Sequence, residues 1–362
     1  MIADEAKLVM VFCSPSHDLP AVLGEVRARV GDVPVIGCTT AGEIATGGPL
    51  AGGVVVAVLG GEGFAVETAY AVESSRGLRQ AGAAVARCMP AGNELPHKVL
   101  LLLTDGLAGD QREIVRGAYG VLGAGVPLVG GCAGDDLRMK RTSQFHGDQV
   151  LTDAVVGAAI RSSGPLGIGV RHGWRRVGDP MLVTQSAGNR VHTLDDRPAL
   201  DAYLDHLGVP EPADGDQVGL TRLALTHPLG LGRPGGGNEE LVRFISGGDF
   251  AKRSLECIAE VPQGAFVWIM EGDADSVLDA TDQAGGDSVA ALDGRPPLGL
   301  IAFDCIARRG VLGDAGINAE IDRLSTLASG APVAGFYTYG EIARTQGLRG
   351  FHNQTLVVLA VS

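Results

Sequence analysis

The sequence predicts a mixed α/β protein, built mainly of stacked α/β sheets in two domains of similar size. The chain has 362 residues, 45% of them hydrophobic, which is enough to fill more than one core. Short apolar runs alternate with amphipathic stretches of helical period, a pattern typical of α/β proteins. The turn dipeptide Gly188-Asn189 lies near the middle of the chain, so we expect domains at 1–187 and 188–362.

The first half contains eight apolar runs that fit strands and three stretches that fit helices. The strands are expected at 8–12, 34–37, 53–59, 64–70, 98–104, 127–130, 155–160 and 166–171, and the helices at 20–30, 74–88 and 111–122. Only four residues, 60–63, separate the third strand from the fourth, which predicts a hairpin because a parallel crossover needs a dozen residues or more. The sheet is therefore expected to be mixed.

The second half begins with a helix expected at 199–207. Asp196 precedes Pro198 by two positions, where its side chain could cap that helix. Strands are expected to follow at 220–225, 241–245, 266–271, 298–306, 333–339 and 355–361, and the Gly-rich stretch 230–238 reads as a surface loop.

Charge and cysteine content exclude several classes of protein. The formal net charge is −13, and the densest basic stretches, 138–141 and 171–176, are short enough to be solvated loops, so no nucleic-acid partner is expected. The N-terminus carries acids where a signal peptide has basic residues, and the apolar run after it is short, which predicts a cytoplasmic protein without membrane insertion. Six cysteines occur without a C-x-x-C pair, so reduced thiols and no metal site are expected.

A weak internal repeat points to a binding region. Residues 39–44 (TTAGEI) and 337–342 (YTYGEI) each place a Gly-Glu-Ile triplet just beyond an apolar run that contains glycine. In open α/β sheets ligands bind at strand ends of this kind, where backbone groups face a cleft.

The motifs resemble those of the FIST family across nearly the whole chain. Residues 35–44 (VIGCTTAGEI) and 129–136 (VGGCAGDD) resemble the FIST N-terminal domain, and 173–200 resembles the junction of the family's two domains. Residues 302–310 (AFDCIARRG), 335–342 (GFYTYGEI) and 351–355 (FHNQT) resemble the FIST C-terminal domain. The resemblance implies a cytoplasmic sensor, not an enzyme, that binds a small ligand such as an amino acid without a cofactor and signals through a separate kinase, receptor or other protein.

The expected binding site combines these motif segments. Glu43 and Glu341 either cap a neighbouring helix or bind an ammonium group, while Arg308 and nearby glycines could bind a carboxylate. Asp135 with Asp136 reads as a turn in preference to a metal site. The ligand-binding set is therefore predicted to be Cys38, Thr39, Thr40, Gly42, Glu43, Gly131, Cys132, Asp135, Cys305, Arg308, Tyr337, Tyr339, Gly340, Glu341, His352 and Asn353.

Two alternatives stay open. A haem-binding nitric-oxide sensor, which some family members resemble, would need an axial His such as His206 on its expected helix. An enzyme would use Cys38, Cys132 or Cys305 as the nucleophile, although structural packing is the commoner fate of a free cysteine. The P-loop, nucleophile-elbow and H-E-x-x-H motifs are absent from the sequence.

Overall fold

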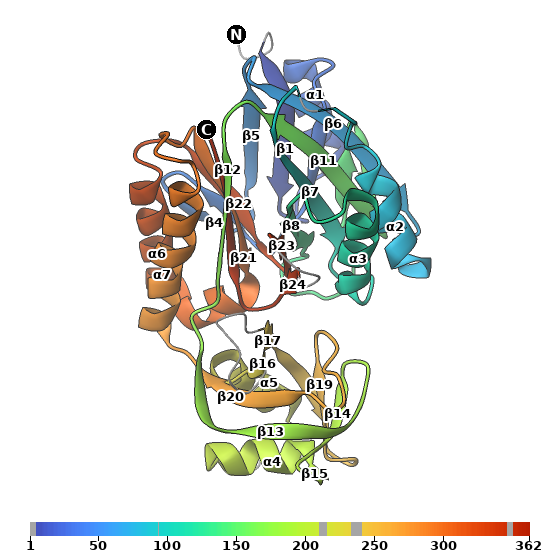
Figure 1. Cartoon of the computed structure of the whole chain (residues 1–362), viewed down its shortest axis with the longest axis vertical. Helices are drawn as coiled ribbons and strands as arrows, with labels where there is room; N and C mark the ends of the chain where they lie inside the picture. Colours follow the sequence, from blue (N-terminus) through green and yellow to red (C-terminus); the bar gives the residue numbers. More distant parts are fainter. Residues whose placement is uncertain (1–4, 93, 210–215, 233–240, 346–349) are drawn as a thin grey trace.

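The computed structural model describes residues 5–92, 94–209, 216–232, 241–345 and 350–362, and these form four mixed or antiparallel sheets with helices packed on them (Figure 1). The mixed α/β class expected from the sequence is confirmed. Three sheets make the upper part of the molecule in Figure 1, and the fourth makes a smaller body below them. None of the helices in the described ranges combines the length and the hydropathy needed to span a bilayer.

The first sheet has the strand order β10-β9-β2-β1-β5. Its strands are β1 (Ala6–Cys13), β2 (Val35–Thr39), β5 (Val54–Gly60), β9 (Gln144–His146) and β10 (Gln149–Leu151). Helix α1 (Leu19–Val30) begins at Asp18, whose side chain accepts a hydrogen bond from the Ala21 N–H group, and it packs Leu23 against Val9 and Val11 of β1.

The second sheet has the order β24-β23-β8-β7-β11-β6. Its strands are β6 (Phe64–Val72), β7 (His97–Asp105), β8 (Leu128–Ala133), β11 (Ala154–Ser162), β23 (Glu341–Arg344) and β24 (Phe351–His352). Helices α2 (Leu78–Ala86) and α3 (Gln111–Leu122) cover its outer face, after a short 3₁₀ turn η1 (Ser74–Arg76). The helix expected at 74–88 is thus a 3₁₀ turn followed by α2.

The third sheet has the order β12-β25-β21-β22-β3-β4. Its strands are β3 (Glu43–Ala45), β4 (Gly48–Leu50), β12 (Leu166–Arg171), β21 (Gly299–Cys305), β22 (Val333–Thr338) and β25 (Leu356–Val361). Helices α6 (Ala274–Ala290) and α7 (Ile306–Leu327) pack on it. The inner faces of all three sheets meet in one apolar core that includes Leu8, Leu101, Phe303 and Phe336.

Each of these sheets contains one parallel strand pair joined through a helix: β1 with β2, β7 with β8, and β21 with β22. A glycine occupies the same place in each second strand. A Cβ atom on Gly37, Gly130 or Gly335 would lie 2.1, 1.9 or 1.9 Å from a backbone oxygen of the first strand, so these positions tolerate no side chain.

The two halves of the chain exchange strands. β3 from the first half pairs with β22, which places Ile44 opposite Gly335, while β23 from the second half pairs with β8, which places Ile342 opposite Gly130. β12 also leaves the first half to pair with β25. The upper three sheets are therefore interlocked by main-chain hydrogen bonds.

The lower body is one continuous excursion of the chain between β12 and α6. Its strands are β13 (Arg175–Ala187), β14 (Arg190–Leu194), β15 (Arg197–Pro198), β16 (Leu229–Gly232), β17 (Leu241–Arg243), β18 (Ile245–Asp249), β19 (Ser254–Cys257) and β20 (Phe266–Glu271). Helices α4 (Ala199–Leu207) and α5 (Gln217–Thr226) complete a separate core around Val183, Tyr203 and Ile269. The boundary expected at 187/188 lies in the turn between β13 and β14.

Two expectations about pairing and secondary structure are wrong. β5 and β6 do not form a hairpin, because β5 pairs with β1 and β6 pairs with β11 in different sheets. The strand expected at 220–225 is part of α5, since Asp216 caps that helix and Leu220 and Ala224 share its buried face. The sheets are nevertheless mixed, as expected.

Three smaller expectations also differ from the structure. Asp196 does not cap α4, because its backbone is left-handed with φ 60° and the helix begins after Pro198. The apolar run at 241–245 is divided between β17 and β18. Of the loop expected at 230–238, residues 230–232 are in β16 and residues 233–238 lie outside the described residues.

Candidate functional site

The two Gly-Glu-Ile segments lie where the exchanged strands cross, and they make matching hydrogen bonds. The hydroxyl groups of Thr40 and Thr338 donate to the carboxylates of Glu43 and Glu341. The second oxygen of Glu43 accepts from the Gly53 N–H group at 2.8 Å, and that of Glu341 accepts from the Thr355 N–H group at 3.1 Å. Both carboxylates are fully buried, and they join the crossing strands β3 and β23 to the residues directly before β5 and β25.

Burial also changes how these two acids titrate. It raises the pKa of Glu43 above its ordinary value and raises the pKa of Glu341 to about 8, despite the lowering effect of the hydrogen bonds. Glu341 therefore keeps a proton near neutral pH. Binding of a ligand ammonium group by either side chain stays a prediction.

The three motif cysteines are packed in the interior. Cys38, Cys132 and Cys305 are buried, and burial raises the pKa of all three thiols, that of Cys132 to about 12. The Thr104 hydroxyl group donates to the sulfur of Cys132 at 3.1 Å. Because the thiolate is the reactive form, these positions are poorly suited to nucleophilic attack.

Arg308 is fully buried in an internal charge network. Its guanidinium group donates to Asp304 at 2.7 Å and to Glu320 at 2.6 Å. Burial raises the pKa of Asp304 well above its ordinary value, and the nearby Glu320 carboxylate adds to that effect. Another donor binds the His172 carbonyl oxygen at 3.0 Å, and thus Arg308 fixes the start of the lower body.

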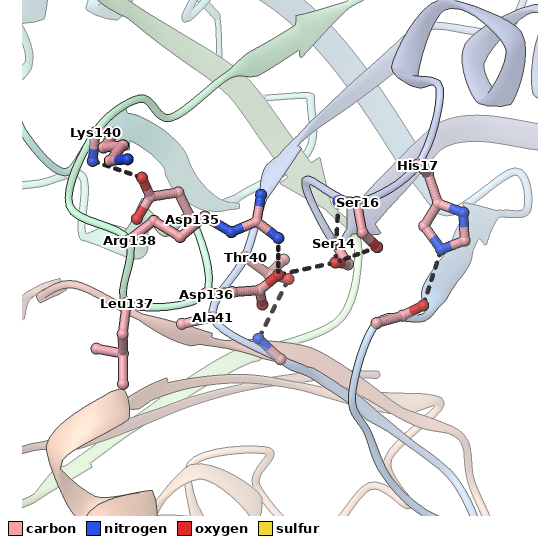
Figure 2. A network of polar contacts seen from close by, with 12 residues as sticks. Ser14, Ser16, His17, Thr40, Ala41, Asp135, Asp136, Leu137, Arg138 and Lys140 are labelled. Atoms are coloured by element: carbon pink, nitrogen blue, oxygen red, sulfur yellow. Dashed lines mark hydrogen bonds and ion pairs between the residues drawn. The ribbon is translucent and has the colours of Figure 1, made fainter.

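Asp135 is the centre of a tight loop at the carboxyl ends of β1, β2 and β8 (Figure 2). Its carboxylate accepts from the N–H groups of Met139, Lys140 and Arg141 at 2.7–2.9 Å, and from the Tyr339 hydroxyl group at 2.6 Å. Burial raises the pKa of Asp135, but these hydrogen bonds outweigh that effect and hold it below its ordinary value. The carboxylate is an acceptor for the loop, in agreement with the turn interpretation.

Asp136 points to other partners in the same loop. Its carboxylate accepts from the Ser14 hydroxyl group at 3.0 Å, and Figure 2 shows it between Ser14 and Arg138. Its backbone is left-handed, with φ 56°. In the described part of the chain, no three His, Cys, Asp or Glu side chains are placed to hold a metal ion.

A cavity of about 700 Å³ lies at the junction between the lower body and the upper sheets. Its lining comes from the β12–β13 connection, from β17 and α6, and from the second half near β23 and β25. Of the predicted residues, His352 lines this cavity, and Asp135 lines another of about 600 Å³ beside the start of α1. Neither Glu43 nor Glu341 lines either cavity.

The junction cavity offers cations, neutral imidazoles and a buried donor. Three arginines line it, Arg171 from the end of β12 and Arg175 and Arg176 from the start of β13. Arg171 pairs with Asp287, Arg175 pairs with Glu271, and Arg176 lies over the Trp268 ring. Asp287 and Glu271 offset the charges of Arg171 and Arg175, so these arginines line one wall as hydrogen-bond donors whose positive charge is partly neutralised.

The imidazoles and the indole lie deeper. Burial lowers the pKa of both His172 and His352 to about 4, so both are neutral at pH 7. Trp174 is 4% exposed, and its Nε1–H group has no hydrogen-bond partner among the described residues. The indole donor is therefore unsatisfied, but its nitrogen is buried beside Gly272 within the wall of the cavity, so a ligand would reach it only if the wall shifts.

Sequence reasoning missed most of this cavity. The sequence predicts a solvated basic loop at 171–176, whereas these residues connect the two bodies and line the cavity. The signal in the sequence is the mixture of His172, Gly173 and Trp174 within the arginines, which is unusual for a simple charged loop.

Comparison with known proteins agrees with this architecture. A model of the FIST N domain matches residues 7–197, and a model of the FIST C domain matches residues 199–344. An uncharacterized protein of Mycobacterium tuberculosis is 28% identical over 355 residues, covering 96% of this chain and 89% of the relative. An uncharacterized protein of Mycobacterium bovis is 30% identical over 244 residues, covering 64% of this chain and 59% of the relative. The chain belongs to the FIST family.

Proposed function

We propose that this FIST-family chain is a sensor that binds a small carboxylate-bearing metabolite, such as an amino acid, in the junction cavity. The observation that carries the proposal is the position of the cavity, because both the lower body and the upper sheets contribute to its lining. A ligand that contacts both bodies stabilises one relative orientation of them, which is how binding becomes a conformational signal.

The connections support a hinge at this place. The chain enters the lower body through His172, Gly173 and Trp174 and leaves it through Gly272 and Asp273, next to α6. Gly173 has φ 92°, and a Cβ atom there would lie 2.8 Å from the Ser276 oxygen, so its backbone geometry favours glycine. A change at these few residues would reorient the lower body while the interlocked upper sheets stay fixed.

The chemistry of the lining favours a ligand with a carboxylate. The Trp174 Nε1–H group lacks an acceptor in the wall of the cavity, and the Arg171, Arg175 and Arg176 side chains line the same cavity as donors, although Asp287 and Glu271 offset the charges of the first two. An α-amino group would find the carboxylate of Asp279 or the amide of Gln283, which also line the cavity. The predicted set contributes His352 to this site.

Thermal denaturation against a panel of amino acids and other small carboxylates tests the proposal. A ligand at a hundred times its Kd adds about 2.7 kcal/mol to the free energy of unfolding, so binding raises Tm. Trp174→Phe keeps an aromatic ring but removes the N–H group, and we expect it to weaken binding about tenfold with the unliganded Tm largely retained. If no compound raises Tm, or if the tightest one binds equally well to Trp174→Phe, the proposed site is wrong.

A separate partner protein would detect the ligand through the change in orientation of the lower body at this hinge. We expect the ligand to change the small-angle scattering profile, because closure of the lower body alters the distance distribution. A ligand that raises Tm but leaves this profile unchanged would support binding while contradicting the hinge mechanism.

Haem is the second candidate, and the neutral imidazoles of His172 and His352 in the junction cavity favour it. His206, the axial haem ligand expected from the sequence, lies in the lower body, where its Nε2 atom is 3.3 Å from the Val177 carbonyl oxygen. An absorption spectrum of the purified protein titrated with haem decides: a saturable Soret band that shifts in His172→Ala supports haem, and no saturable band rules it out.

A further inference from the structure

Strand β5 ends the first sheet with an apolar edge that has no strand partner among the described residues. β5 pairs with β1 on one side and is the last strand of the order β10-β9-β2-β1-β5. Its sequence, VVVAVLG, contains no charge and no proline. Two side chains on its outer face, Val56 and Val58, are 47% and 41% exposed, because the cluster under α1 covers β1 and β2 and includes only Val54 of β5.

The other strands that end the described sheets carry protection that β5 lacks. β4, β10 and β17 have three residues each, β24 has two, and the pairing of β18 with β19 contains a register shift. β12 lies against α6 and ends in Arg171, while β6 lies against α2 and carries Glu67. Short length, charge, bulges and helix cover are the usual devices that prevent edge-to-edge pairing. β5 has seven uncharged residues, and its one register shift against β1 lies at Leu59 and Gly60, beyond the exposed valines.

The hydrogen bonds of β5 indicate which groups face outward. The Ser14 N–H group donates to the Gly53 carbonyl oxygen, so the odd-numbered residues that follow in β5 are bonded to β1. The N–H and C=O groups of Val54, Val56 and Val58 therefore point away from the sheet. The two exposed valines thus also carry outward-facing backbone groups, as a strand that receives another strand would require.

We infer that β5 pairs antiparallel with β5 of a second copy of this chain, about a twofold axis at Ala57. This register is the one that places Val56 of each copy opposite Val58 of the other, so all four exposed valines meet. It also avoids placing like charges together, because it sets the exposed Glu62 of one copy opposite Gly52 of the other, whose carbonyl oxygen lies 2.9 Å from the His17 Nε2 atom. An isologous contact of this kind closes at two copies.

The charge of the molecule favours this face over the rest of the surface. Each copy has a net charge of −13, so two copies repel at most approaches. An uncharged strand with an acid at one end and an imidazole at the other lets them approach without placing like charges together. A second copy also matches the strand in length and in the absence of charge, which a charged peptide would not.

Sedimentation velocity over the micromolar range tests the inference. We expect a reversible dimer whose Kd rises at least about tenfold in Val56→Lys or Val58→Lys, since each lysine would be covered by a valine of the other copy. Val218→Lys, at a 69% exposed position on α5, is the matched control and should leave Kd unchanged. Tm of each variant shows that the exposed position tolerates the change.

A charge exchange tests the register. His17→Glu should weaken the dimer because it faces Glu62 of the other copy, and adding Glu62→Lys to the same chain should restore it. A wild-type protein that sediments as a monomer at every concentration overturns the inference. A dimer whose Kd is unchanged in Val56→Lys also overturns the inference, because the contact would then lie elsewhere. If adding Glu62→Lys does not restore the dimer weakened by His17→Glu, the proposed register is wrong.

Discussion

Replacing Glu341 with glutamine should remove a pH dependence of folding that one buried carboxyl group creates. In the folded protein burial raises the pKa of Glu341 to about 8, while the unfolded chain titrates near 4.5. Between these values the folded state holds a proton that the unfolded state has released, so the free energy of unfolding falls as pH rises. The slope is about 1.4 kcal/mol per pH unit, and the whole interval amounts to about 5 kcal/mol.

Glutamine has the same shape and can keep both hydrogen bonds, since its oxygen accepts from the Thr355 N–H group and its amide reaches the Thr338 hydroxyl oxygen. The Glu341→Gln variant should therefore gain stability relative to the wild type as pH rises from 5 to 8. His172 and His352 have lowered pKa values and add stability as pH rises from about 4 toward 6.5, but they do so in both proteins. The difference between the two proteins isolates Glu341.

Urea denaturation at a series of pH values measures that difference through the midpoint and slope. A gain of about 2 kcal/mol or more between pH 5 and pH 8 agrees with a protonated, buried Glu341. Glu43→Gln, the equivalent change in the first Gly-Glu-Ile segment, should show the same sign because burial also raises that pKa. A constant difference across the range would refute the reasoning, since it would mean that Glu341 is ionised in the folded protein.

Two further predictions concern packing and the buried charge. Gly335→Ala should lower the free energy of unfolding by about 3 kcal/mol or more, because the added Cβ atom would lie 1.9 Å from a backbone oxygen. Gly24→Ala on α1 has open space around it and should raise that free energy by about 0.5–1 kcal/mol. Equal urea midpoints for the two variants would contradict the close approach at Gly335. Arg308→Met should lower the free energy of unfolding by about 3–5 kcal/mol and expose the chain near His172 to proteolysis, because it breaks the buried ion pairs. Arg309→Met on the same helix should be less destabilising, and equal losses in the two variants would mean that the buried network does not stabilise the fold.

Local pattern was enough to predict the strands that lie in the middle of the sheets. β1, β7, β21 and β25 are buried on both faces and appear in the sequence as continuous apolar runs, so their position needs no knowledge of their partners. Local pattern did not predict which strands pair. β5 and β6 are joined by a short loop yet enter different sheets, where β5 pairs with β1 and β6 pairs with β11 on opposite sides of one shared core.

Short apolar runs also left helix and strand ambiguous. Residues 220–225 read equally well as a strand or as one side of a helix, and the cap at Asp216, which accepts from the Gly219 N–H group, was the local signal for the helix. The candidate site was harder to predict. The junction cavity joins 171–176 to α6 and to residues near 352, and only the tertiary structure brings these distant segments together.

The Gly-Glu-Ile repeat has a structural explanation that does not require a ligand. At each segment a strand leaves its own half of the chain and joins a sheet of the other half, and the next stretch of chain contributes one N–H group that faces the interior. Glu43 accepts from Gly53 and Glu341 accepts from Thr355, so the carboxylate satisfies that donor where no strand can. Because both crossings use the same device, the upper sheets are held as one unit. Under the proposed hinge, relative motion would occur at the connections at 172–174 and 272–273, and the first of these lines the cavity.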